Sequence, residues 1–439
     1  MRVNLTSEQS VYFGQKFLDL IRNMPSLTKG KISLKETEGV FHSLSKSDQT
    51  NKFSRPLWDG VIKSNLPPTV SRVGVIGAEL PSVAIIPDFK GGVDVIIEID
   101  STEEKLEIKT INLEKGGLAA NTTEALFKMG YGARFFSIHG RGEIADFHER
   151  LLRDSGINPV RLIDSGRDAY IHPCTIEKND RKQEFWFVQN REAFPEHVIK
   201  ESTEILEAEL KRGSNETLVL SAIPPAGASN DYFAIMSRIA HANNKPVVFN
   251  PKQYDHIEEI TLKLFGEGRV DILKPNVVEF VQFLKYAGIV YENEKDKTNE
   301  LKKEIKNHDF IQTIHLARKL MNQKGFMYRI RMMFITFGED GLLIVTPRHV
   351  VHLEVPKIKL ECSSGAGDSG IAGIIAQANE NKIDLRSNLH SSTLEELGRA
   401  FIYAATATAS LPGNNIAGRK EIEALKNQEK IKTITFSIF

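Results

Sequence analysis

The chain has 439 residues, of which 41% are hydrophobic and 26% are charged, an ordinary balance for a globular protein. At roughly 150 residues per domain, this length predicts about two to three domains or one large decorated domain. The 57 basic and 57 acidic residues cancel, so we expect neither a nucleic-acid partner nor an anionic membrane surface. The two cysteines, Cys174 and Cys362, are too few for a disulfide framework or a four-cysteine zinc site.

The N-terminal sequence lacks the apolar segment of a secretory signal, and no uncharged apolar run reaches the ~18 residues of a membrane span. We therefore expect a cytoplasmic location. Thr6 and Gln9 have the spacing of a helix-capping pair, and apolar residues then recur at helical intervals. Residues 1–70 are interpreted as an N-terminal helical extension that precedes a main domain at 71–439.

From residue 72 onward, predicted strands alternate with predicted helices. The clearest helical patterns lie at 121–129 and 144–154, and the short apolar strands are expected at 72–77, 133–138, 160–163, 217–221, 247–250, 272–274 and 333–336. Two further runs, 93–99 and 106–111, are rich in β-branched residues and are separated by a polar turn. The alternation predicts an α/β fold with helices on both faces of a parallel sheet.

The strongest local motif is the turn Gly365-Ala366-Gly367-Asp368, which precedes an apolar helical pattern. Glycine lets the backbone turn sharply and approach a ligand, and the free N–H groups at the start of a helix form an anion site. A carboxylate at this point can take a proton from a substrate hydroxyl while the N–H groups hold a transferring phosphoryl group. The structural alternative is an ordinary turn in which Asp368 caps the helix.

Three weaker motifs lie upstream of this turn. The pair Gly116-Gly117 permits close backbone approach, and Asn121 can hydrogen-bond a polar ligand at the start of a helix. Asn276 and Glu279 lie on one face of the first turn of a predicted helix, where a carboxylate can organise metal-bound water near phosphates. Residues 334–345 contain two apolar runs around a Gly-x-x-Gly turn. Taken alone, the first motif is better explained as a plain turn with a helix cap, the second as a capping pair and the third as a hairpin.

A competing motif begins at Gly140, where Gly-x-Gly-x-x-Ala lies between a predicted strand and a predicted helix. With Asp164 ending the next strand, it fits the fingerprint of a dinucleotide-binding oxidoreductase. The side chains of Arg141 and Glu143 would crowd that loop, which counts against this hypothesis. The sequence contains no P-loop, no His-Glu-x-x-His zinc motif and no Gly-x-Ser-x-Gly elbow.

The order of these motifs resembles that of the PfkB/ribokinase family of carbohydrate and nucleoside kinases, over about residues 72–425. The matching motifs are Gly116-Gly117 with Asn121, Asn250-Pro251, Asn276 with Glu279, Thr336 with Gly338, and residues 364–376. The resemblance implies a ribokinase-like fold of three α/β/α layers, with a mostly parallel central sheet and a small β lid. The lid is expected from residues 93–112 and 168–190, and such lids can pair edge to edge into a homodimer.

The resemblance also implies a kinase that uses ATP and Mg²⁺ to phosphorylate a hydroxyl of a sugar, sugar derivative or nucleoside. Asp368 would be the catalytic base, with an anion hole formed by the N–H groups of Gly365, Ala366 and Gly367. The remaining implied roles are metal positioning by Glu279, nucleotide binding by Asn250, Asn276, Thr336, Gly338 and Gly341, and acceptor binding by Gly116, Gly117 and Asn121. Phosphoryl transfer depends mainly on such positioning and charge neutralisation, and a closing lid excludes water.

Two positions depart from the family pattern. Counted from Gly77, the aspartate that usually ends the first strand and binds the acceptor is replaced by Ser82. The second signature begins with Cys362-Ser363 in place of Asp-Thr, which implies weak or absent activation by potassium. These departures and the N-terminal extension motivate an alternative, a ribokinase-fold pseudoenzyme that binds a nucleotide or metabolite in a regulatory role. The retention of Asp368, Asn276 and Glu279 argues against it.

Overall fold

The computed structural model describes most of the chain from residue 80 onward. The described residues are 2–3, 80–89, 92–101, 106–140, 143–159, 161–164, 170–178, 181–185, 193–212, 216–221, 223–252, 257–291, 293–323 and 329–437. Apart from residues 2–3, the predicted N-terminal extension lies outside these ranges, as does the predicted strand at 72–77. No helix in the described ranges is long and apolar enough to cross a lipid bilayer.

A ten-stranded sheet forms the centre of the main domain, in the order β15-β14-β13-β12-β11-β10-β9-β2-β5-β6. Neighbouring strands from β6 to β12 are parallel, and those from β12 to β15 are antiparallel. In chain order the strands are β2 (Ser82–Asp88), β5 (Gly132–His139), β6 (Arg161–Asp164), β9 (Thr217–Ser221), β10 (Val247–Asn250), β11 (Val270–Leu273), β12 (Ile330–Thr336), β13 (Leu342–Val345), β14 (His349–Leu353) and β15 (Thr433–Ser437).

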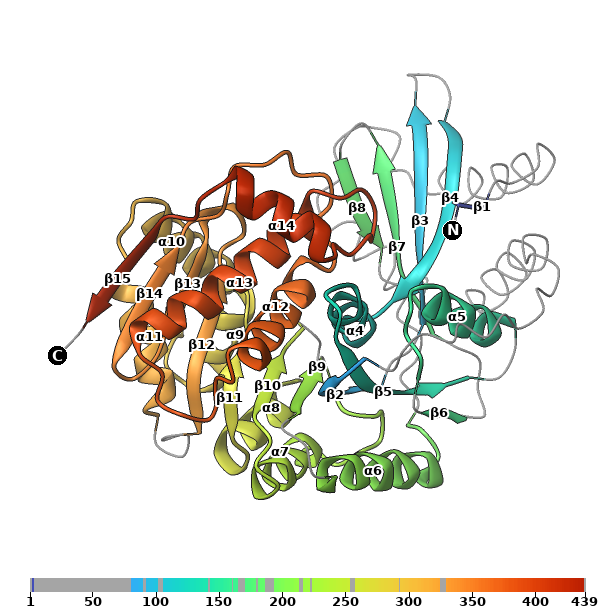
Figure 1. Ribbon diagram of the computed structural model, residues 1–439, viewed down its shortest axis with the longest axis horizontal. Coiled ribbons are helices and arrows are strands. Elements are labelled where there is room, and N and C mark those ends of the chain that lie inside the picture. The colour runs from blue at the N-terminus through green and yellow to red at the C-terminus, as the bar shows by residue number, and fades with distance from the viewer. Residues whose placement is uncertain are drawn as a thin grey trace.

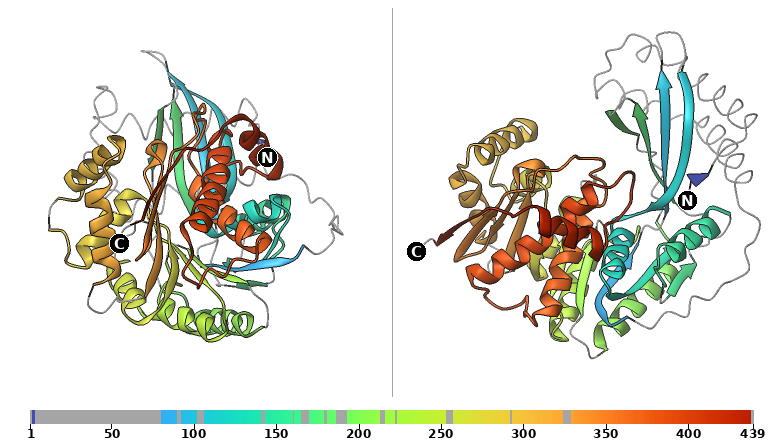
Figure 2. Two further views of the ribbon diagram at one scale, coloured as in Figure 1. Left: turned by 60° about the vertical axis from the view of Figure 1, so that its left-hand side comes forward. Right: turned by 45° about the horizontal axis from the view of Figure 1, so that its top comes forward.

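Helices cover both faces of this sheet (Figures 1 and 2). One face packs against α6 (Glu196–Lys211), α7 (Tyr232–Ala242), α8 (Ile257–Glu267), α9 (Val277–Tyr286), α10 (Glu294–Lys306) and α11 (Ile311–Met321). The other packs against α4 (Leu118–Lys128), α5 (Glu143–Asp154), α12 (Ala366–Glu380), α13 (Ser391–Ala409) and α14 (Arg419–Gln428).

The central strands are apolar at consecutive positions because each face of the sheet is buried. In β9, Leu218 and Leu220 belong to one hydrophobic cluster, and Val219 between them belongs to the other. The predicted three-layer fold with a mostly parallel sheet is therefore confirmed. Helix α10 is rich in charged residues of both signs; its Leu301 and Ile305 are buried, and most of its charged residues face solvent.

A second sheet has five strands in the order β1-β4-β3-β7-β8 and lies beside the main domain (Figures 1 and 2). Its strands are β1 (Arg2–Val3), β3 (Gly92–Ser101), β4 (Leu106–Gly116), β7 (Tyr170–Lys178) and β8 (Arg181–Phe185). The two stretches proposed for a lid thus contribute strands to one separate sheet. β4 runs into the main domain through Gly117 and leads directly to α4.

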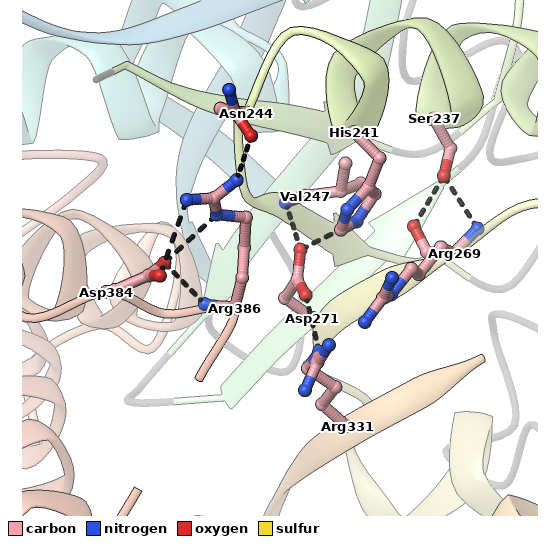
Figure 3. Close-up of polar contacts among 9 residues, drawn as sticks. All are labelled: Ser237, His241, Asn244, Val247, Arg269, Asp271, Arg331, Asp384 and Arg386. Atoms are coloured by element: carbon pink, nitrogen blue, oxygen red, sulfur yellow. Dashed lines mark hydrogen bonds and ion pairs between the residues drawn. The ribbon is translucent and has the colours of Figure 1, made fainter. Parts of the chain in front are cut away.

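A buried carboxylate, that of Asp271, holds the amino ends of three central strands together (Figure 3). Asp271 of β11 is fully buried and accepts a hydrogen bond of 2.8 Å from the backbone N–H of Val247, at the start of β10. The same carboxylate lies 2.9 Å from His241 Nε2 and 3.1 Å from Arg331 Nε, on β12. Three neighbouring strands are therefore fixed at this edge, which is opposite the edge where β10 ends at Asn250.

Candidate active site

Polar residues gather at the carboxyl ends of the parallel strands. Asn250 ends β10, Lys274 directly follows β11, Thr336 ends β12 and Asp88 ends β2. In open α/β sheets, ligands bind outside this edge because the side chains from several strands meet there. The candidate site is therefore built from segments that lie far apart in the sequence.

The N-terminus of α12 points its first turn into this edge. Gly365 is the N-cap residue and has a φ of 72°, in the left-handed region that favours glycine. A Cβ at this position would also lie 2.6 Å from Ile416 Cδ1, so the Ile416 side chain would have to shift for a larger residue. The helix begins at Ala366 and carries Asp368 in its first turn, where free N–H groups and the helix dipole favour an anion.

Asp368 is held by two amides from different elements. Asn121 Nδ2, on α4, donates to Oδ2 at 3.0 Å, and Asn250 Nδ2 donates to Oδ1 at 2.8 Å. Burial raises the pKa of Asp368 above its ordinary value, and the Lys274 ammonium and the two amides oppose that rise. The result is a buried carboxyl group with fixed orientation and a raised pKa, which are properties of a general base.

Two buried polar atoms at the carboxyl ends of β9 and β10 have no hydrogen-bond partner among the described residues: Ser221 Oγ and Asn250 Oδ1. The two residues are register partners at the ends of β10 and β9. Because buried polar atoms are almost always paired, they are available to the polar groups of a ligand.

The Lys274 ammonium lies at the start of α12. This side chain is buried, and its Nζ would be only 2.9 Å from a Cβ placed on Gly367. A cation and a helix N-terminus at one point suit a phosphoryl group, because both stabilise negative charge. The sequence motif contained Lys274 but gave it no role, and its position directly after a buried strand was the available signal.

The expected anion hole differs in one respect from the geometry of the turn. The N–H group of Ala366 donates to Ser363 O at 3.3 Å, a long hydrogen bond within the turn. The N–H group of Ser369 makes the i to i−4 hydrogen bond typical of a helix, to Gly365 O at 2.9 Å. Ala366 therefore has an internal partner that a ligand would have to replace or share.

Asn276 and Glu279 form a complete capping box at the start of α9. The Asn276 side chain accepts from the N–H of Glu279 at 2.9 Å, and Glu279 Oε2 accepts from the N–H of Asn276 at 2.8 Å. Burial raises the pKa of Glu279, whereas the Lys274 ammonium lowers it and the Asp368 carboxylate adds to the rise. The capping interpretation is thus correct for the geometry, and the same carboxylate lies within electrostatic range of the candidate base.

The candidate site suits a divalent cation that is held by a single carboxylate and water rather than by several protein ligands. The described residues contain no group of three or more His, Cys, Asp or Glu side chains that could form a protein cage for a metal. Mg²⁺ ordinarily binds one or two carboxylates and completes its shell with water and substrate phosphates. Glu279, near both Asp368 and Lys274, suits that mode.

The predicted nucleotide loop adjoins the capping box. Asn276 and Thr336 form a parallel bridge, and the N–H of Thr336 donates to Pro275 O at 3.0 Å. The loop continues through the short helix η2 (Gly338–Asp340), and Gly341 O closes it by accepting from the N–H of Phe337 at 2.9 Å. β12 and β13 then pair as the expected hairpin.

Ser82 is not at the carboxyl end of the first strand, so the register counted from Gly77 was wrong. Ser82 begins β2, and its Oγ donates to Glu216 Oε1 at 2.6 Å, at the amino edge of the sheet. The residue at the carboxyl end is Asp88, which is buried and accepts from Ser137 Oγ at 3.2 Å.

Pro87 explains why this strand was missed. Proline argues against a central strand because it has no N–H to donate. Pairing of β2 with β9 covers only Ala84 and Ile85, and at Pro87 the ladder continues with β5 alone. The signal for Asp88 was the buried apolar run directly before it.

Most of the predicted site residues come together in two neighbouring groups. The first joins Asn121, Asn250, Asp368 and the turn at Gly365, because Asn121 Nδ2 would lie 3.5 Å from a Cβ there. The second contains Asn276, Glu279, Thr336, Gly338 and Gly341. Lys274 acts electrostatically on both groups. Gly116 ends β4 and Gly117 caps α4, so that pair sets the position of Asn121.

Solved structures share this fold. Phosphofructokinase-2 of Escherichia coli, in complex with substrates and products, superposes with a TM-score of 0.60 at 17% identity, covering 79% of this chain and 99% of that one. An enzyme of Thermotoga maritima described as a possible 1-phosphofructokinase superposes with a TM-score of 0.57 at 15% identity, covering 81% of this chain and all of that one (100%).

Sequence comparison places the chain more specifically. Residues 88–415 match the model of the family described as pfkB family carbohydrate kinase. The matched range includes every candidate site residue except Ser82. The chain therefore belongs to the pfkB family of carbohydrate kinases.

Proposed function

We propose that this protein transfers the γ-phosphoryl group of ATP, with Mg²⁺, to a hydroxyl group of a sugar or sugar derivative. The observation that carries the proposal is the position of Asp368. Its carboxylate lies in the first turn of α12, is fixed by the Asn121 and Asn250 amides, and is next to Lys274 at the start of the same helix. A carboxylate suited to act as a base and a helix N-terminus suited to bind an anion thus share one helical turn, which supports the proposal.

In the proposed reaction, Asp368 accepts the proton of the acceptor hydroxyl. The hydroxyl oxygen then forms a bond to the γ-phosphorus as the bond from that phosphorus to the bridging oxygen of ADP breaks. The N-terminus of α12 and the Lys274 ammonium stabilise the charge on the transferring group. Because phosphoryl transfer involves little covalent work by the protein, this positioning accounts for most of the catalysis.

Mg²⁺, when bound, supplies positive charge that neutralises the phosphates of ATP. Glu279 would hold it, largely through water, and the capping box with Asn276 keeps that carboxylate in one orientation. Thr336, Gly338 and Gly341 would line the nucleotide site on the loop that adjoins Asn276.

The acceptor would lie between Asp88, Asn121 and the turn at Gly116-Gly117. Asn250 Oδ1 and Ser221 Oγ are further polar groups for its hydroxyls. The five-stranded sheet would close over this region and exclude water, which would otherwise hydrolyse ATP. A homodimer through that sheet remains our proposal for the assembly; a tetrameric inhibited form is described for the Escherichia coli phosphofructokinase-2.

The pseudoenzyme alternative is weaker than the sequence suggested. One of its motives was the loss of an aspartate at Ser82, but the strand end is occupied by Asp88. Another motive, Cys362, concerns the second signature, where the resemblance implies a cation-binding aspartate, and it leaves Asp368 in place.

The proposal is tested by measuring ATP consumption with Mg²⁺ and a panel of sugars, sugar phosphates, sugar acids and nucleosides. Asp368→Asn serves as the blank, because it preserves size and removes the base. We expect at least one sugar acceptor to support turnover that the blank lacks. ATP binding without acceptor-dependent turnover across the panel would instead favour the pseudoenzyme.

A further inference from the structure

A buried lysine outside the family motifs lies one contact away from the proposed base. Lys115 is in β4, directly before the Gly116-Gly117 turn, and is only 5% exposed. Its Nζ donates to Asn121 Oδ1 at 2.7 Å and lies 2.7 Å from Glu124 Oε2. The mechanism described above makes no use of this ammonium group.

The chemistry of lysine fixes the orientation of the Asn121 amide. An ammonium group has donors only, so Lys115 can contact only the oxygen end, Oδ1. The nitrogen end, Nδ2, is thereby directed at Asp368 Oδ2, 3.0 Å away. A flipped amide would place NH2 against an ammonium and oxygen against a carboxylate, so both favourable contacts would become repulsive.

The Glu124 carboxylate offsets the desolvation cost of burying the Lys115 ammonium. It is buried on α4, and its second oxygen, Oε1, lies 2.7 Å from Lys128 Nζ. Buried charges require partners in good geometry, because they have lost their hydration. The sequence of contacts Lys128–Glu124–Lys115–Asn121–Asp368 is therefore held at each step by an ion pair or a hydrogen bond.

We propose that Lys115 is a positioning residue for phosphoryl transfer: it locks the Asn121 amide so that Nδ2 faces Asp368 and holds that carboxyl group in one orientation. The inference rests on the proposed function, because Lys115 acts only through the base. Lys115 also pairs with Val93 in the five-stranded sheet, so the same contact ties the base to the sheet that would close over the acceptor.

Other charged groups act on Asp368 and stay in place when Lys115 is replaced. Lys274 and Lys252 lower the pKa of Asp368, burial raises it, and Glu279 lies within electrostatic range. The Asn121 hydrogen bond is one of the interactions that lower this pKa. An amide released by Lys115 no longer holds that bond, so the pKa of Asp368 should rise further.

The test compares Lys115→Met with Lys115→Met/Glu124→Gln, in which the carboxylate left behind is also neutralised. The double variant keeps the test open if the single variant does not fold. Lys245→Met is the matched control, because Lys245 is fully buried and pairs with Glu216 at 3.5 Å on the opposite edge of the sheet.

The primary readout is a ¹³C NMR titration of the Asp368 carboxyl, assigned by its loss in Asp368→Asn, and it needs no substrate. We expect the midpoint to rise by about one pH unit in the Lys115 variants and to stay unchanged in Lys245→Met, because one hydrogen bond to a charged group is worth about that much. With an acceptor, the acidic limb of kcat should move upward by the same amount, with little change in the KM for ATP.

An unchanged Asp368 midpoint in the Lys115 variants would overturn the inference, and so would an equal shift in Lys245→Met. Failure of the proposed function would be recognised separately, as wild-type protein without acceptor-dependent turnover. In that case a raised midpoint would still establish that Lys115 controls the Asp368 carboxylate.

Discussion

Replacing Gly367 by alanine tests whether the Lys274 ammonium takes part in phosphoryl transfer. The new Cβ would lie 2.9 Å from Lys274 Nζ, inside the 3.4–4 Å range of ordinary contact. The lysine end must therefore retreat by about 0.5–1 Å. At an effective dielectric constant of about 20, the attraction between the Lys274 ammonium and a unit charge on the phosphoryl group falls from ~5.5 kcal/mol at ~3 Å to ~4.2 kcal/mol at ~4 Å, which corresponds to a retreat of about 1 Å. The loss of ~1.4 kcal/mol predicts a decrease in kcat/KM of about 10-fold.

Thermal unfolding separates this effect from damage to the fold. Gly367 lies within α12 and does not have a positive φ, and alanine is favoured over glycine in a helix by up to ~1 kcal/mol. The melting temperature of Gly367→Ala should therefore stay level or rise slightly while activity falls.

A double-mutant cycle identifies the lysine as the cause. In a Lys274→Met background, Gly367→Ala should change kcat/KM less than about twofold, because the group that it displaces is gone. The reasoning would be refuted by an equal loss in both backgrounds, or by unchanged kcat/KM in the single variant.

Four further variants probe the remaining parts of the site. Glu279→Gln should raise the Mg²⁺ concentration for half-maximal activity several-fold at fixed ATP, and an unchanged half-point would reject its metal role. In Gly341→Ala, the Cβ would lie 2.4 Å from Leu353 O at a φ of 113°. Calorimetry should then detect ATP binding weakened about 10-fold or more, and wild-type affinity would contradict the assigned loop. Asp88→Asn should raise the KM for the acceptor, whereas Ser82→Ala should leave it unchanged. A raised KM in Ser82→Ala with an unchanged KM in Asp88→Asn would instead support Ser82 as the acceptor-binding residue.

The fold could be predicted because the periodicity of the chain is strong. The strands β9 and β10 occur at the predicted residues, since runs buried on both faces are continuously apolar and are bounded by polar turns. Strand β2 (Ser82–Asp88) was not predicted because Pro87 interrupts its apolar pattern; in the structure, its ladder with β9 is short.

The site was predictable in its parts rather than in its assembly. Asp368 lies 247 residues from Asn121 and 118 from Asn250, and only the topology of the sheet brings these residues together. Lys115 and Lys274 received no role from the sequence because lysine is almost never fully buried. Their burial and their partners depend on packing between elements, which local spacing does not encode.

The most direct test of the central claim measures kcat against pH for wild-type protein and Asp368→Asn, with ATP binding followed by calorimetry. Because the pKa of Asp368 is raised by burial, wild-type kcat should fall as the pH drops through that raised value and the base becomes protonated. Asp368→Asn should be slower by about 10²–10⁴-fold, lack this limb, and bind ATP as tightly as wild type. A variant that keeps wild-type turnover and the same acidic limb would contradict the role of Asp368 as the base.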